Sequence, residues 1–162
     1  MKKLCMSFVA VAALMATPAM AADPSANYLV QGTVNAACYA NTGGTVDFGT
    51  MSIDSTTGRL NGGTTASSSG SNVWCNGINS TLSFSSTGQL TTTNTTTDTN
   101  FTSTLTFTPS VTLGGSNVTN GAKIGAKSGS LVVTASSLSD GGKLPVAGDY
   151  SGLITVTLTP AS

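Results

Sequence analysis

The chain has 162 residues, 39% of them hydrophobic, which is enough to bury an ordinary single-domain core. Only 7% are charged, the formal net charge is zero, and no histidine occurs. The small, scattered charge argues against nucleic acid or an anionic membrane as a partner, and the missing imidazoles exclude a Ser-His-Asp triad and the usual zinc sites.

Residues 1–21 have the three parts of a secretory signal peptide. Two lysines follow the initiator, an apolar run extends over Leu4–Met15, and a small-x-small cleavage site stands at Ala19–Ala21. A membrane anchor is the alternative, but the apolar run is shorter than the roughly 20 residues that span a bilayer. We therefore expect cleavage before Ala22 and an exported, single-domain mature chain of residues 22–162 with no membrane span.

Two cysteines, Cys38 and Cys75, remain in the mature chain. An even pair in an exported protein indicates a disulfide, which would stabilise the fold by about 4 kcal/mol in the chain-entropy model. The alternative, a redox-active pair, lacks the Cys-x-x-Cys spacing that lowers a thiol pKa.

Apolar and polar residues alternate over Asn27–Cys38, which predicts a half-buried strand. One face carries Tyr28, Val30, Val34, Ala36 and Cys38, with Gly32 as a gap in the row. Close to an N-terminus, such a strand either completes its own sheet or is donated to the sheet of another chain.

Short strands separated by turns are predicted through the middle of the chain. Thr45–Gly49 alternates with Val46 and Phe48 inward, whereas residues 54–71 predict a mobile loop or irregular edge with only Leu60 as an anchor.

Strand signals return at Val73–Cys75 and Leu82–Phe84, either as one interrupted strand or as two strands joined by a turn. Leu105 and Phe107 alternate with threonines in the next strand, which Pro109 is expected to end or to confine to an edge.

Near the end of the chain, Leu131–Val133 predicts a strand buried on both faces. The last strand has the clearest alternation, with Leu153 as the one apolar residue on its polar side. No window of the mature chain has a helical period, so about seven short strands predict an all-β, antiparallel sandwich of immunoglobulin type. The inward row of the last strand is Tyr150, Gly152, Ile154, Val156 and Leu158.

No catalytic, cofactor or metal site is expected, and the chain is not predicted to be an enzyme. The aspartates mostly stand beside Gly or Thr in predicted turns, where capping is the simpler interpretation than a paired-carboxylate glycosidase site. Calcium binding at Asp140 or Asp149 is an open alternative, although neither lies in a dense oxygen-ligand loop. Trp74, the single tryptophan, is interpreted as packing within the core or between strands, with sugar stacking as the alternative.

Four segments, taken in order, resemble bacterial chaperone-usher pilins, and most of all the spore coat U-like subunits of archaic pili. They are Val30–Cys38, Val46–Met51, Val73–Gly77 and Ala147–Leu158.

This resemblance implies an immunoglobulin-like sandwich that lacks its last strand and is completed by the leading segment of the next subunit. The partners implied are a periplasmic chaperone, an outer-membrane usher and neighbouring pilin subunits, in a homopolymer or a mixed fibre. The protein would pass through the periplasm to a surface fimbria that supports adhesion or biofilm formation. A self-complete secreted β-sandwich that binds a glycan or another surface ligand is the alternative.

Carried over to this sequence, the donor segment is residues 22–31, and the acceptor groove follows the last strand. Because little of that segment is strongly apolar, residues up to Ala36 are expected to serve partly as donor. The implied site residues are Tyr28, Leu29 and Val30 in the donor strand, Tyr150, Ile154, Val156 and Leu158 at the groove edge, and a Cys38–Cys75 bridge.

Overall fold

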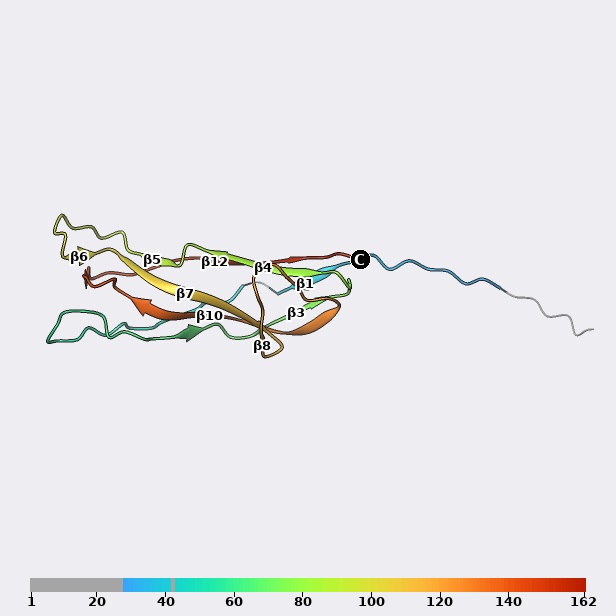
Figure 1. The fold of residues 1–162 in the computed structure, drawn as a ribbon, viewed down its shortest axis with the longest axis horizontal. Coiled ribbons are helices and arrows are strands. Elements are labelled where there is room, and N and C mark those ends of the chain that lie inside the picture. The colour runs from blue at the N-terminus through green and yellow to red at the C-terminus, as the bar shows by residue number, and fades with distance from the viewer. Residues whose placement is uncertain (1–27, 42) are drawn as a thin grey trace, which may run out of the picture. The chain divides into compact units, whose positions relative to one another are not determined.

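The computed structural model describes residues 28–41 and 43–162, and these ranges contain strands and turns but no helix (Figure 1). The predicted signal peptide, its cleavage site and residues 22–27 of the predicted donor segment lie outside the described residues. The chain divides into two units, Met1–Thr33 and Val34–Ser162. In the first unit, the described residues 28–33 belong to no strand and are exposed.

The second unit contains all twelve strands that the described residues form. These are β1 (Cys38–Ala40), β2 (Ala66–Ser67), β3 (Ser71–Cys75), β4 (Thr81–Ser86), β5 (Gln89–Thr91), β6 (Phe101–Thr102), β7 (Thr104–Leu113), β8 (Ser116–Asn117), β9 (Ala122–Lys123), β10 (Lys127–Ser139), β11 (Leu144–Pro145) and β12 (Ile154–Thr159).

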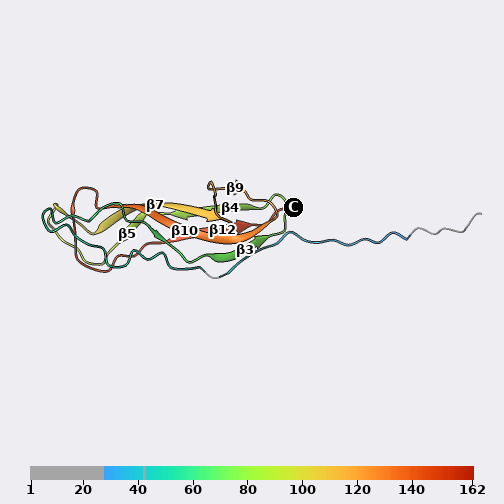
Figure 2. The same ribbon diagram turned by 90° about the horizontal axis from the view of Figure 1, so that it is seen from below.

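Two sheets form the body of this unit, with β12 and β4 above β10 and β3 in Figure 1. Strands of both sheets run along the long axis of the unit (Figure 2). The larger has the strand order β1-β3-β10-β7-β5, with β2 added to β10 and β8 added to β7, and the smaller has the order β12-β4-β9. All ladders in these sheets are antiparallel, while β6 and β11 form a separate parallel pair. The prediction of an all-β antiparallel sandwich is confirmed.

The core lies between the two sheets. Leu82 of β4, which is fully buried, packs with Val73, Val111, Leu113 and Leu131 of the larger sheet. A second buried cluster toward the other end of β7 and β10 consists of Leu105, Phe107, Ala135 and Leu138. Burial of this apolar area, at about 25 cal/mol per Å², is the main force that holds the sheets together.

A β-bulge near the end of β10 decides which of its residues reach the core. The ladder to β7 shifts register there, and Ser137 adopts a φ of 57°. Before the bulge Ala135 is buried, and after it Leu138 and Asp140 are buried, although strict alternation would have turned these two outward. The extra residue therefore moves Leu138 and Asp140 to the inner face.

Pro109 lies inside a long strand, so the prediction that it would end the strand was wrong. β7 continues through Pro109, which is paired with Ala135 of β10. Phe107 donates its N–H to the Gly88 carbonyl at 2.8 Å, on the side away from β10. Residue 109 is two positions further along the strand, so its nitrogen points to the same side as the Phe107 N–H. β5 does not extend as far as Pro109 on that side. The missing N–H interrupts no ladder, because this stretch of β7 is an edge on that side. The alternative prediction, that Pro109 confines the strand to an edge, therefore holds.

Four further segments were predicted as strands, and the structure bears out these predictions to different degrees. Residues 28–37 and 45–49 join no ladder, although both alternate as strands do. Of the two alternatives for the strand signals around Asn76, the structure has the second: they are separate strands, β3 and β4, which belong to different sheets. Val132 and Val133 are only half-buried. Val132 lies on the outer face of the larger sheet, whereas Val133 faces inward and lines a pocket.

The loop of residues 54–61 has an anchor that the sequence did not reveal, the buried carboxylate of Asp140. Its Oδ1 accepts a hydrogen bond from Arg59 Nη2 at 2.6 Å and from the Gly142 N–H at 2.9 Å. Its Oδ2 accepts from the Leu60 N–H at 3.0 Å. The pKa of Asp140 is lowered to about 2, chiefly by the hydrogen bond from the Arg59 guanidinium. Burial of the carboxylate acts in the opposite direction and raises the pKa.

Replacing Asp140 by Asn is expected to destabilise the fold by about 2 kcal/mol at pH 7, because the charged form of Asp140 is preferred in the folded state. The depressed pKa contributes stability above the ordinary carboxyl value of 3.8, and this contribution is lost as the pH falls toward 2. Urea denaturation at pH 7 and at pH 2 measures both effects. D98N, in an exposed turn, is the matched control. Equal losses in D140N at the two pH values would contradict the prediction.

Candidate functional site: the groove beside β12

β12 has one paired edge and one edge that joins no ladder in the described chain. It pairs with β4 from Ile154 to Thr159 and is the edge strand of the smaller sheet. The predicted alternation is confirmed, since Ile154, Val156 and Leu158 are half-buried while the threonines between them are exposed. The strand thus has an apolar inner row and, along one edge, backbone N–H and C=O groups that take part in no ladder of the described residues.

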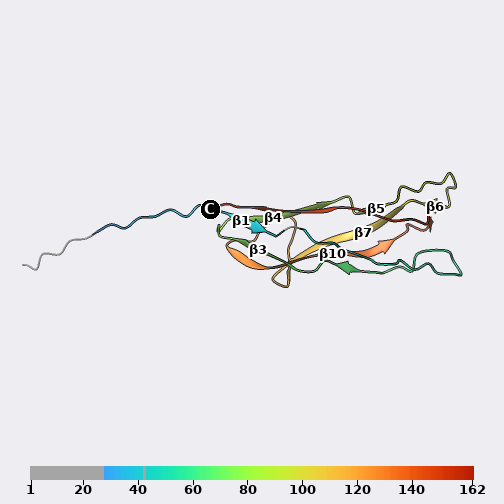
Figure 3. The same ribbon diagram turned by 180° about the vertical axis from the view of Figure 1, so that it is seen from behind.

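The end of β12 is held in place by the loop between β3 and β4. The Ala161 N–H donates to Ser80 Oγ at 3.4 Å, and the Asn79 N–H donates to the Ala161 carbonyl at 3.2 Å. Asn79 Nδ2 donates to the Ser162 carbonyl at 2.6 Å. A Cβ at Gly77 would overlap the Ala161 carbonyl, so glycine is required for this close approach. The C-terminus lies at the same end as β1 (Figure 3).

A segment that follows β1 carries a second apolar row. Val46, Phe48 and Met51 are half-buried, and the residues between them are exposed. The predicted inward direction of Val46 and Phe48 is therefore confirmed, but no strand pairs with residues 43–51. The Asp47 carboxylate accepts a hydrogen bond from the Gly49 N–H at 2.8 Å and so shapes the turn within the segment.

An apolar groove lies between β12 and this segment. Its first part has a volume of about 380 Å³, with Val46 and Phe48 on one side and the inner row of β12 on the other. Core residues of the larger sheet also line it, namely Leu90, Phe107, Leu131, Val133 and Ala135.

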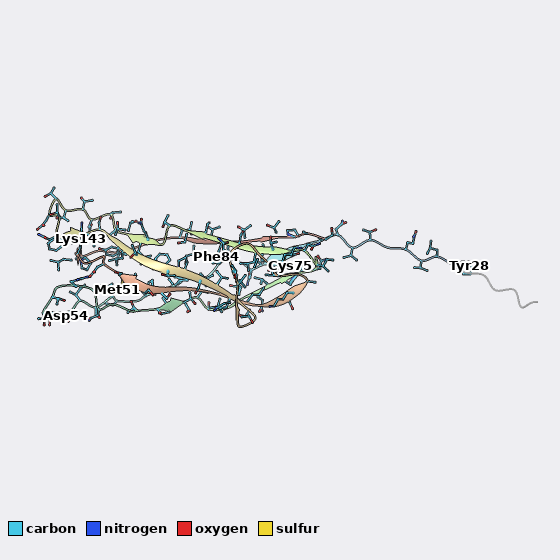
Figure 4. All side chains as sticks on the ribbon, in the orientation of Figure 1. Tyr28, Met51, Asp54, Cys75, Phe84 and Lys143 are labelled. Atoms are coloured by element: carbon cyan, nitrogen blue, oxygen red, sulfur yellow. A yellow bond between two sulfur atoms is a disulfide. The ribbon has the colours of Figure 1, made fainter. Side chains whose placement is uncertain are left out.

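The groove continues toward the loops at the other end of the unit. A second part, of about 710 Å³, shares Val46, Phe48 and Gly152 with the first and extends to Met51 and Tyr150. Figure 4 shows Met51 and Cys75 at opposite ends of the unit. The first part is lined mainly by apolar side chains and the second by polar and apolar surface in equal measure. A hollow with alternating side chains on both walls has the form that an extended strand requires.

Gly152 and Tyr150 shape the far part of the groove. A Cβ at Gly152 would overlap the Gln89 carbonyl oxygen, so only glycine allows β5 to approach here. The Tyr150 hydroxyl donates a hydrogen bond to the Val146 carbonyl at 2.7 Å, and burial raises the pKa of this phenol. The tyrosine is thus fixed at the groove with its polar end satisfied.

The apolar residues of the predicted donor segment are exposed. Tyr28 is 88% exposed, Leu29 82% and Val30 90%. Val34 is 86% exposed as well and belongs to the same alternating row. The period of two had already placed Val34 on this face, within the stretch up to Ala36 that was expected to serve partly as donor.

The predicted disulfide between Cys38 and Cys75 is confirmed, with an S–S distance of 2.00 Å. The two residues are directly opposite each other in the β1–β3 ladder, and Cys75 is buried. The bridge fastens the short strand β1, from which the Val46 wall of the groove continues.

Trp74 lies on the surface rather than in the core. It is 44% exposed and pairs across the ladder with Tyr39, at 6.2 Å between ring centroids and 19° between ring planes. The expectation of inter-strand packing is confirmed, and the expectation of a core position is not. An exposed ring is also what the surface-ligand alternative requires.

Three of the aspartates that were candidates for catalysis, Asp47, Asp54 and Asp98, cap turns. Hydrogen bonds from Thr57 and Thr56 hold the pKa of Asp54 below its usual value, and Asp98 accepts from the Asn100 N–H at 2.9 Å. In residues 28–41 and 43–162, no three side chains of His, Cys, Asp or Glu gather as a metal site. Nor does any helix in these ranges have the length and apolarity to cross a membrane.

Known protein families and curated sequences offer no guide to the function of this chain. A scan against models of protein families and a search of curated protein sequences both gave no match.

Proposed function

We propose that this protein is a structural subunit of an exported surface fibre, a pilus or fimbria, and that subunits are joined by donor-strand exchange. The leading segment of one subunit occupies the groove beside β12 of the next. One observation carries the proposal: the groove has apolar alternating walls and an edge of β12 outside any ladder, while a matching row at Tyr28, Val30 and Val34 is exposed.

An added strand would both pair with the free edge of β12 and fill the apolar groove. Its backbone pairs with the free edge of β12, and its alternate side chains enter between the walls. Full burial of each Val contributes about 1.5–3 kcal/mol, so three apolar residues supply several kcal/mol per joint.

An empty groove of this kind would cause aggregation. Exposed strand edges pair with one another unless they are covered. A periplasmic chaperone that covers the groove before assembly, and an outer-membrane usher that exchanges it for the next subunit, would meet this need. The signal peptide pattern and the disulfide support a route through an oxidising compartment. In the assembled fibre the protein would support adhesion or biofilm formation.

Deleting Asp23–Gln31 is expected to give a subunit that folds, forms its disulfide and binds chaperone, yet does not enter fibres as a donor. The physical reason is the loss of Tyr28 and Val30 from the row that fills the groove. Fibre formation in the presence of chaperone and usher is followed by sedimentation and electron microscopy. The matched control is Q31S/T33S, which changes only the polar face of the segment.

Normal polymerisation of the deletion variant would overturn the proposal. A stable monomer, obtained without chaperone and indifferent to the deletion, would instead favour the self-complete sandwich.

A further inference from the structure

The side chain of Asn76, just after β3, continues the pairing of β1 and β3 beyond the disulfide. Its Oδ1 accepts a hydrogen bond from the Ala37 N–H at 2.6 Å, and its Nδ2 donates to the Asn35 carbonyl at 3.0 Å. The Asn76 backbone N–H also donates to the Ala37 carbonyl at 3.1 Å. These three bonds, named the Asn76 clamp, hold residues 35–37 in line with β1.

The clamp and the groove lie in opposite directions along the chain from β1. Ala40 at the end of β1 lines the groove, as do residues 41, 43–46 and 48 that come after it. Residues 35–37, before β1, are held by the clamp as an extension of the strand away from that wall. A chain entering its own groove would therefore have to reverse direction ahead of Asn35.

Such a reversal would consume part of the apolar row. A tight two-residue turn needs positive φ, and Gly32 is the one glycine in residues 28–37. A turn at Gly32 removes Val34 from the row and leaves only Tyr28 and Val30 to enter the groove. A segment that enters the groove of a second copy needs no reversal and keeps all three apolar residues.

If reversal of the chain had no cost, the leading segment would enter the groove of its own subunit. A segment tethered close to its own binding site has an effective concentration in the millimolar range for a short flexible connection, which exceeds that of free subunits. Fibre formation therefore requires a feature that disfavours self-closure.

We propose that Asn76 is this feature: a positioning residue that directs residues 28–34 into the groove of a second copy of the chain instead of its own. The inference rests on the proposed function, because it assumes that the groove accepts this segment.

The test compares N76A and N76D with N72A in the full mature chain. Asn72 is exposed on the same strand and serves as the matched control. N76A removes both side-chain bonds and keeps the backbone bond and the disulfide. N76D keeps the acceptor for the Ala37 N–H and loses the donor to Asn35. Circular dichroism and disulfide formation verify that each variant is folded.

Size-exclusion chromatography with light scattering measures the closed monomer, and chymotrypsin cleavage after Tyr28 reports whether the segment is buried in it. We expect the ratio of protected monomer to assembled subunits to rise about tenfold in N76A, less in N76D, and not in N72A. Equal ratios in N76A and N72A would overturn the inference.

A second measurement separates this inference from the proposed function. A synthetic peptide of residues 22–36 is added to the variant that lacks Asp23–Gln31. Peptide binding together with an unchanged N76A ratio would refute the role of Asn76 alone. Absence of peptide binding would refute the proposed function itself.

Discussion

Val156→Asp is expected to prevent a subunit from accepting the donor segment, while its own fold is retained. Val156 is in the middle of the inner row of β12, half-buried and facing the groove. A carboxylate there stays hydrated while the groove is open and loses its water when a strand enters. Burial of even a neutral polar group without a partner costs about 2–7 kcal/mol, so we expect donor binding to weaken at least about thirtyfold.

Thr157→Asp is the matched control, because Thr157 is the next residue of the same strand and is exposed on the opposite face. Binding of the synthetic segment 22–36, followed by fluorescence anisotropy, compares the two variants. Fibre formation with chaperone and usher gives a second readout. If Val156→Asp accepted the segment as well as Thr157→Asp, the groove would not be the site of subunit joining.

Removal of the disulfide is expected to cause the largest loss of stability. The bridge closes a sequence separation of 37 residues and secures β1, which has only three residues. The chain-entropy model gives about 4 kcal/mol for a loop of this size, within the usual range of about 2–5 kcal/mol. C38A/C75A is therefore expected to lose that amount of unfolding free energy in urea denaturation.

Detachment of β1 would also displace the wall that carries Val46, so C38A/C75A is expected to bind the donor segment more weakly. The reduced wild-type protein is the control, because it breaks the covalent bond and leaves both side chains in place. A loss of less than about 1 kcal/mol in both proteins would show that the β1–β3 ladder holds without the bridge.

The two ends of the chain are where sequence reasoning located candidate residues best. Alternation in residues 154–158 identified the inner row of β12, because one face of this strand is apolar without exception. The same period at residues 28–36 identified an apolar row. The period does not indicate whether this segment pairs within its own chain or with another chain. That Val34 is exposed, like Tyr28 and Val30, became visible only in the structure.

What the sequence by itself determined is therefore local: the all-β class, the alternating rows, the disulfide pair and the aspartates that cap turns. These follow from periods and from short-range hydrogen bonding, which a few neighbouring residues settle. The tertiary structure decided the rest, namely that residues 43–51 lie across a groove from β12, that Pro109 lies in a long strand, and that a bulge turns Asp140 inward toward Arg59. Each of these depends on which distant strand lies alongside, and that choice is made by packing across the whole sandwich rather than by any local pattern.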